Sequence, residues 1–350
     1  ENTGEVTLVD YMITSEAARA WNVSRRRVGY LLESGRIPGA QKKGKLWLIP
    51  KDAGRPADGR RREEKPSASD LSLELEKIIK ENSGPLAPDG TCPERDAERA
   101  YLQGDFARVL ACFRDTNGCE AAKLYASLAA VAAAISLGDY PAYREIEDFL
   151  QLYITGKERS LASAYAELGL ASAAVSVNAP KMVPEWLKAG DFGVLPLEIR
   201  PFALYLRTKY LFYAGQAEAA LAAGQTGLAL CPPGQGAVYY VIYLHISCAL
   251  ACCHLGRIKE AENFLTDAMR LSLPQGFITP FAEVVTHLGG LVESCLKKDF
   301  PDSYTPVLAQ WERTVKNWIS FHNQFSKDNI TLLLTLREYY VAAQLARKIP

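Results

Sequence analysis

The chain has 350 residues, which is enough for two or three structural units with a buried core, and its formal net charge is zero. It contains no run of about eighteen or more apolar residues and no N-terminal stretch of the secretory type, which argues against a membrane span and against export. The eight cysteines are scattered, several within apolar helix-like runs, as is typical of reduced thiols rather than of a disulfide scaffold. We therefore expect a cytoplasmic protein with no membrane partner.

The zero net charge conceals a strongly basic segment near the N-terminus. Residues 11–62 hold thirteen Lys and Arg against four Asp and Glu, so the remainder of the chain is net acidic. This asymmetry predicts a polyanionic partner for the first segment only. Composition predicts a compact basic unit over 11–53, a flexible linker over 54–70 and a helical zone from Leu71 onward, of which 71–328 precede a separate motif over 329–350.

The basic unit begins with two predicted helices. Thr14 or Ser15 is suited to cap the first helix, and Ser24 is suited to cap the second, which is expected to end at Ser34-Gly35. The apolar side chains expected to face the core are Ala17, Ala18 and Trp21 in the first helix and Val28, Leu31 and Leu32 in the second.

A β-hairpin is predicted after the second helix. Pro38-Gly39 is a turn signal, and two short strands over 40–43 and 46–49 follow around Lys43-Gly44. The stretch GAQKKGKLWLIP (39–50) also contains G-x-x-x-x-G-K, which is most of a nucleotide-binding loop. Leu46 stands where such a loop carries Ser or Thr for Mg²⁺, and a strand-like run follows instead of a helix, so nucleotide binding is not expected.

The segment ITSEAARAWNVSRRRVGYLLESGRIPGAQKKGKLWLIPKDAGRP (13–56) resembles the excisionase-like, MerR-related winged helix-turn-helix family. The resemblance rests on TSEAA, VSRRRV, GRIPGA and WLIPKDA, which occur in the family's order. It implies that the helix beginning at Ser24 is the recognition helix for DNA and that the hairpin is the wing. Trp47 and Ile49 would then pack back onto the core. Trp21 and Trp47 are expected to be core anchors, with base stacking as the alternative.

The candidate DNA-binding residues lie on the second helix and on the hairpin. Three consecutive arginines fan out over about 200° around a helix, so one or two of them are expected to face a groove. A solvated charged face is the alternative for this run, and Tyr30 is suited either to reach a phosphate or to cover the core. The predicted set is Ser24, Arg25, Arg26, Arg27, Tyr30, Arg36, Lys42, Lys43 and Lys45.

The zone from Leu71 predicts pairs of helices joined by glycine turns. YLQGDFARVLACF (101–113) is echoed by ISLGDYPAYREIEDF (135–149), with Gly104 and Gly138 34 residues apart, and Gly215 and Gly256 mark a second echo with a spacing of 41. The zone resembles degenerate tetratricopeptide repeats of bacterial transcription activators, which implies an α-solenoid. An irregular helical bundle is the alternative. In either case the fold class is mainly α.

One cysteine- and histidine-rich helix allows two interpretations. His245, Cys248 and Cys252 share a helix face, with Cys253 and His254 beside them, and such a set can bind a metal. The surrounding stretch VIYLHISCALACCHLG is apolar on nearly every side, which favours packing and predicts no metal and no cofactor. The chain carries none of the common catalytic motifs, so an enzyme is not expected.

The tail NITLLLTLREYYVAAQLARKIP (329–350) resembles the opening helix of LuxR-type DNA-binding domains. The matching positions are Leu334, Thr335, Arg337, Glu338, Val341 and Leu345. The alternative is that this segment is the last helix of the solenoid.

These features together predict a DNA-binding transcriptional regulator with double-stranded DNA as its partner. The helical body is expected to bind a protein, peptide or small-molecule effector, and a homodimer is an open alternative to a monomer. The competing interpretation is an interaction scaffold without enzymatic activity, in which the basic unit binds an acidic protein. Salt-dependent binding to DNA distinguishes the two.

Overall fold

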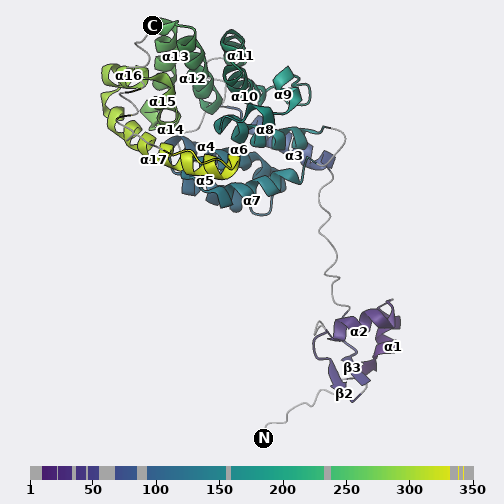
Figure 1. Ribbon diagram of the computed structural model, residues 1–350. Helices are drawn as coiled ribbons and strands as arrows, with labels where there is room; N and C mark the ends of the chain where they lie inside the picture. The colour runs from purple at the N-terminus through teal and green to yellow at the C-terminus, as the bar shows by residue number, and fades with distance from the viewer. Residues whose placement is uncertain are drawn as a thin grey trace. The chain divides into compact units, whose positions relative to one another are not determined.

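The computed structural model describes residues 10–21, 23–33, 37–44, 46–54, 68–84, 93–154, 159–231 and 238–331, together with Glu338 and Ala342. The chain is mainly helical, as predicted, and divides into two compact units, Glu1–Lys65 and Pro66–Pro350 (Figure 1). The division falls in the segment predicted as a linker, of which residues 55–67 lie outside the described part of the chain.

The N-terminal unit combines two helices with a three-stranded antiparallel sheet of order β1-β3-β2. In this sheet Met12 lies opposite Ile49, and Lys42 lies opposite Trp47. Its elements are β1 (Tyr11–Ile13), α1 (Thr14–Ala20), α2 (Arg25–Glu33), β2 (Gln41–Lys43) and β3 (Leu46–Pro50).

The core of this unit contains the buried helix positions and Ile49 that the apolar pattern predicts, and it also contains Met12 and Ile37, which were not predicted. Its buried side chains come from both helices and the sheet, and the two tryptophans, Trp21 and Trp47, pack against them while remaining partly exposed. The buried set is Met12, Ala17, Ala18, Val28, Leu31, Leu32, Ile37 and Ile49.

Two local predictions for this unit are wrong. The strand β1 was not expected, because a three-residue strand has no periodicity of its own and exists through its pairing with β3. Because β1 runs directly into α1, the N-cap of that helix is Ile13 rather than Thr14 or Ser15. The Glu16 carboxylate accepts a hydrogen bond from the Ile13 N–H at 2.9 Å and so supplies the capping contact.

The second unit is built from helices that follow one another closely along the chain. The first helix begins at Ala68, three residues before the predicted start of the helical zone, and the last residues of the tail lie largely outside the described part. The helices are α3 (Ala68–Glu81), α4 (Pro93–Gln103), α5 (Phe106–Arg114), α6 (Glu120–Leu137), α7 (Tyr140–Gln151), α8 (Leu161–Ser176), α9 (Glu185–Ala189), α10 (Arg200–Tyr213), α11 (Ala217–Ala229), α12 (Val238–His254), α13 (Ile258–Ser272), α14 (Thr279–Ala282), α15 (Val285–Leu288), α16 (Leu291–Asp299) and α17 (Pro301–Ser326).

Four helix pairs share the glycine turn that the sequence echoes predict. Gly104, Gly138, Gly215 and Gly256 have φ values of +85°, +70°, +76° and +74°, which is the left-handed conformation that glycine adopts without strain. The residue after each glycine donates its N–H to a carbonyl oxygen five residues earlier, at 2.8–2.9 Å. These bonds run from Asp105 to Ala100, from Asp139 to Ala134, from Gln216 to Leu211 and from Arg257 to Cys252.

Glycines also allow the helices to approach closely. A Cβ atom on Gly224 would lie 2.6 Å from Cys248 Sγ, and one on Gly227 would lie 2.7 Å from a methyl group of Leu244. A Cβ on Gly169 of α8 would similarly meet Leu150 of α7 at 2.8 Å. These contacts join neighbouring helix pairs without a gap between them.

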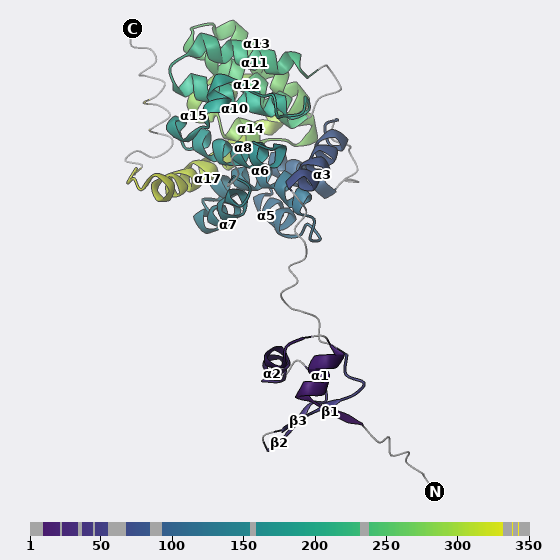
Figure 2. The same cartoon turned by 90° about the vertical axis from the view of Figure 1, so that its right-hand side faces the viewer.

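The long helix α17 returns across the earlier helices, and Figures 1 and 2 show it lying against α6. Asn317 donates its side-chain N–H to the carbonyl oxygen of Ser136 in α6 at 2.9 Å. Trp318 donates its indole N–H to the carbonyl oxygen of Ser176 in α8 at 2.8 Å. These bonds use carbonyl groups at the C-terminal ends of α6 and α8, which have no partner within their own helices.

The helix α6 is long and apolar enough to cross a membrane by length and composition. In this unit 72% of its apolar window is buried, and it packs against α3, α4, α5, α7, α8 and α17. Such burial is typical of a core helix.

Candidate nucleic-acid interface

The helix α2 presents one face to the core and the opposite face to solvent. Val28, Leu31 and Leu32 are buried, with exposed fractions of 3% or less. Because successive helical residues are about 100° apart, Arg26 and Tyr30 lie one turn apart on the face opposite Val28. Arg26 is exposed and Tyr30 retains 57% of its surface, so Tyr30 does not cover the core.

The N-terminal end of α2 carries the other described arginine. Arg25 is exposed in the first turn, and the carbonyl oxygen of Ser24 accepts a hydrogen bond from the Val28 N–H at 3.2 Å, so Ser24 stands at the start of the helix. The unpaired N–H groups of a helix N-terminus attract anions. This end of α2 is therefore suited to a phosphate or a base edge.

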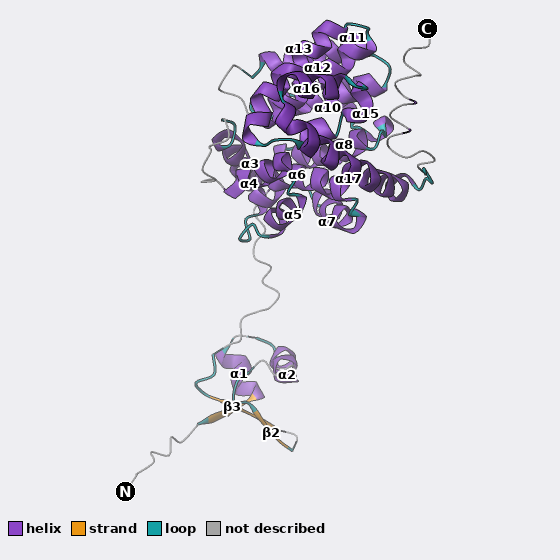
Figure 3. Cartoon of the chain, turned by 90° about the vertical axis from the view of Figure 1, so that its left-hand side faces the viewer, coloured by secondary structure: helices purple, strands orange, loops and turns teal. Residues whose placement is uncertain are grey.

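The strand β2 places two exposed lysines near the tip of the antiparallel pair. Lys42 Nζ lies 5.5 Å from the centroid of the Trp47 ring on β3, which is the geometry of a cation–π contact. Lys43 pairs with Leu46 across the turn at Gly44, whose φ is +64°. Figure 2 shows α2 and β2 on the side of this unit away from β1, and Figure 3, the opposite view, shows them on the side away from α1.

The candidate cations differ from another lysine of the same unit in their ion pairing. Lys51 forms an ion pair of 2.9 Å with Asp10, and this hydrogen bond raises the pKa of Lys51. Within the described residues, no ion pair joins Arg25, Arg26, Lys42 or Lys43 to a carboxylate. Their charges are therefore available to an external anion.

The remaining predicted residues fall partly outside the described chain. Ser24 is described and exposed, and the backbone of Arg27 belongs to α2 although its side chain is not described. Arg36 and Lys45 lie outside the described residues. The structure thus places Ser24, Arg25, Arg26, Tyr30, Lys42 and Lys43 at exposed positions in or beside α2 and β2, and it does not describe the side chains of Arg27, Arg36 and Lys45.

Sequence reasoning missed Gly29, which lies inside α2. No atom lies within 4 Å of the position that a Cβ on Gly29 would occupy, so nothing in this unit requires a glycine there. A glycine within a helix is destabilising relative to alanine. The signal in the sequence was a lone glycine within a helical pattern, which lowers helix stability and so calls for a packing or functional explanation.

We expect Gly29→Ala to raise the free energy of unfolding of the N-terminal unit by about 0.5–1 kcal/mol. The matched control is Gly44→Ala, which also has open space for its Cβ but has φ +64° and should lower that free energy by about 1–2 kcal/mol. Chemical denaturation followed by circular dichroism compares the two variants. Destabilisation by Gly29→Ala would show that the glycine serves the packing of α2.

The G-x-x-x-x-G-K stretch does not have the strand–loop–helix context of a nucleotide-binding loop. Gly39 (φ +73°) belongs to the turn before β2, Gly44 connects β2 to β3, and Leu46 begins a strand. The backbone from Leu46 onward is therefore extended, as predicted, and offers no helix N-terminus to a phosphate.

The histidine- and cysteine-rich helix α12 is packed into the second unit. Cys248 and Cys252 are buried, and burial raises the pKa of Cys252 to about 11 and that of Cys248 to about 12. The His245 ring lies 5.9 Å from Phe264, and the His254 ring lies 5.7 Å from Phe212. The described residues contain no group of three or more side chains placed to hold a metal ion.

The described cysteines are free thiols, and Cys92 lies outside the described residues. Comparison of the chain with models of protein families, with curated proteins and with solved structures finds no match.

Proposed function

We propose that this chain is a DNA-binding transcriptional regulator whose N-terminal unit is an excisionase-like, MerR-related winged helix-turn-helix. The observation that carries the proposal is that exposed cations on both α2 and β2 make no ion pair with any described carboxylate. A recognition helix beside a basic wing uses cations in these two places.

In this proposal α2 enters the major groove with its N-terminal end. Arg26 faces outward from the core and reads base edges or a neighbouring phosphate, and Tyr30 donates its hydroxyl to the backbone one turn further along. Gly29 keeps the flank of α2 free of a side chain, which allows the helix to approach the groove more closely. Lys42 and Lys43 bind phosphates beside that groove.

The helical unit is proposed to be the sensing body of the regulator. Its helix pairs share one glycine turn and stack through small residues, as tetratricopeptide-like repeats do, which supports a solenoid over an irregular bundle. Residues 329–350 are proposed to begin a LuxR-type domain, with the last helix of the solenoid as the alternative. A cytoplasmic location and a homodimer bound to paired half-sites belong to the same proposal.

The test is the salt dependence of DNA binding by the full chain. Each phosphate contact contributes about −0.9 to the slope of log K against log salt, so three or four contacts predict a slope of about −3 to −4. Fluorescence anisotropy with a labelled duplex, taken from a selection of genomic fragments, measures this slope. Absence of duplex binding at low salt would refute the proposal, and equal affinity for poly-L-glutamate would favour the scaffold interpretation.

A further inference from the structure

The second unit contains an open cavity of about 540 Å³, lined by α17, by Ile330 and Thr331 after it, and by helices that precede it. Its wall draws residues from α4, α6, α8, α10, α12, α14, α15 and α17. This volume lies within the range of about 300–1,000 Å³ that is usual for small-molecule sites. The cavity is therefore large enough for a ligand and is built from segments far apart in the sequence.

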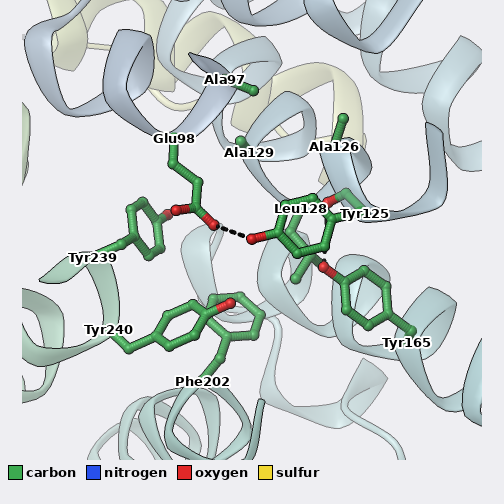
Figure 4. A pocket seen from close by; sticks show the side chains of 10 residues that line it. All are labelled: Ala97, Glu98, Tyr125, Ala126, Leu128, Ala129, Tyr165, Phe202, Tyr239 and Tyr240. Atoms are coloured by element: carbon green, nitrogen blue, oxygen red, sulfur yellow. Dashed lines mark hydrogen bonds between the residues drawn. The ribbon is translucent and has the colours of Figure 1, made fainter. Parts of the chain in front are cut away.

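A neighbouring cavity provides a comparison within the same unit. Figure 4 shows it between α4, α6, α8, α10 and α12, with the Glu98 carboxylate accepting a hydrogen bond from the Tyr125 hydroxyl at 2.9 Å. Its volume is about 10 Å³, so it has room for no more than a water molecule. Tyr239 lines both cavities, which places them side by side along the inner face of α12.

One wall of the large cavity is aromatic. The rings of Tyr101, Tyr239, Tyr243 and Tyr205 follow one another at centroid distances of 6.1, 5.0 and 5.3 Å. Trp318 of α17 lines the same cavity, with Ile135, Val315 and Ile319 among its apolar residues. This lining is suited to an apolar body of two or more side chains.

A carboxylate is fixed in this wall. Glu283 accepts hydrogen bonds at one oxygen from the Tyr101 hydroxyl and at the other from the Tyr243 hydroxyl, the latter at 3.0 Å. Burial raises the pKa of Glu283, although the two tyrosine bonds and Lys209 act in the opposite direction. A carboxylate has about four acceptor positions, so each oxygen can accept one further donor.

An ammonium group faces the same cavity. Lys209 Nζ lies 5.7 Å from the centroid of the Tyr205 ring. Burial acts to lower the pKa of Lys209, but Tyr205, Tyr213 and Glu283 around it outweigh this, and the net shift is upward. Among the described residues no ion pair joins Lys209 to Glu283 or to another carboxylate.

Charge complementarity limits which ligand can fill the cavity. Lys209 is half-buried and makes no ion pair with a described carboxylate, so an external anion next to its ammonium group would be favourable. A ligand with several negative charges would face the fixed carboxylate of Glu283, and a purely cationic ligand would face Lys209. A molecule with one carboxylate, one ammonium group and an apolar body satisfies both charges and the aromatic wall.

We propose that this cavity binds a zwitterionic ligand with apolar side chains, a free amino acid or a short peptide, with its carboxylate at Lys209 and its ammonium group at Glu283. The claim that this cavity is the effector site of a regulator depends on the function proposed above. The claim that it is a binding site depends only on the cavity and the two charges.

Binding is tested first on the unmodified full chain without DNA. The probes are the common free amino acids and the dipeptides built from leucine, valine, phenylalanine and tryptophan, each at millimolar concentration in a thermal-shift assay. A rise in Tm with at least one probe is expected. Comparison of the free amino acids with the dipeptides then shows which of the two classes binds. No shift with any probe would overturn the proposal.

The two charges are then tested on the best probe by isothermal calorimetry. N-acetylation or C-amidation of the probe should each weaken binding about 10- to 100-fold, because each removes one charge-assisted hydrogen bond. Lys209→Gln should lower affinity for the free probe by the same factor and leave the C-amidated probe unaffected. Glu283→Gln should behave in the same way toward the N-acetylated probe. If the N-acetylated or the C-amidated probe binds as tightly as the free probe, the assignment of its charged groups to Lys209 and Glu283 is overturned. This outcome does not depend on whether the variants fold.

The matched control is Glu98→Gln. Glu98 likewise accepts a hydrogen bond from a tyrosine hydroxyl, although it is buried where Glu283 is half-buried, and it lines the small cavity, so its variant should bind the probe with unchanged affinity. A loss equal to that of Glu283→Gln would assign the effect to stability. The effector role is measured separately, as a change in DNA affinity when the probe is added. No change would refute that role while leaving the binding site in place.

Discussion

Replacing Arg26 and Lys43 together with alanine is expected to weaken duplex binding about 10- to 1,000-fold and to make the salt slope less negative by about 1–2. Arg26 lies on the outward face of α2 and Lys43 on the exposed strand β2, so the pair removes one contact from each proposed DNA-binding element. Arg26→Ala alone should also reduce discrimination among DNA sequences if it reads a base edge, whereas Lys43→Ala should weaken all sequences equally.

Lys51→Ala is the matched control for this prediction. It removes the same charge from the same unit, but Lys51 is already paired with Asp10 at 2.9 Å. Its effect on DNA affinity should therefore be much smaller than that of Lys43→Ala. Both Arg26 and Lys43 are exposed, so stability should change by no more than about 0.5 kcal/mol. Equal losses of DNA affinity for Lys43→Ala and Lys51→Ala would show that net charge, and not a defined interface, accounts for the binding.

Gly138→Ala is expected to lower the free energy of unfolding of the helical unit by about 2–4 kcal/mol. Two costs combine at this position. The left-handed backbone at φ +70° is unfavourable for alanine, and the new Cβ would lie 2.9 Å from the backbone oxygen of Asn317 in α17. Because that oxygen belongs to the main chain, the clash is relieved only when α17 moves away from α6.

Gly256→Ala separates the two costs. Gly256 occupies the same turn, with φ +74° and the same hydrogen bonding, but no atom lies within 4 Å of its Cβ position. This variant should therefore cost only about 1–2 kcal/mol. Chemical denaturation compares the free energies, and amide hydrogen exchange over residues 301–326 should become faster only in Gly138→Ala. The same loss in both variants would contradict the close approach of α17 to this turn.

Local regularities allowed much of the N-terminal unit to be predicted. Val28, Leu31 and Leu32 have helical spacing, and Pro38-Gly39 and Lys43-Gly44 provide turn chemistry, so the second helix and the β2–β3 pair followed from neighbouring residues. The strand β1 did not, because its pairing partner lies almost forty residues away. The sequence also left open whether Tyr30 is exposed. Its position on the helical wheel allows it either to reach a phosphate or to cover the core until the packing of α2 is known.

In the helical unit the sequence by itself determined the helix pairs and their turns. A glycine that must adopt positive φ, followed by a new amphipathic run, is a local signal, and Gly104, Gly138, Gly215 and Gly256 all carry it. Only the tertiary structure decided where α17 lies, because that position depends on Asn317 and Trp318 reaching carbonyl groups of Ser136 and Ser176, more than one hundred residues earlier. The cavity lined by Lys209 and Glu283 could likewise not be predicted from the sequence, because neither residue belongs to a recognisable motif. Their proximity is a product of how distant helices pack, and packing is set by all of the side chains together.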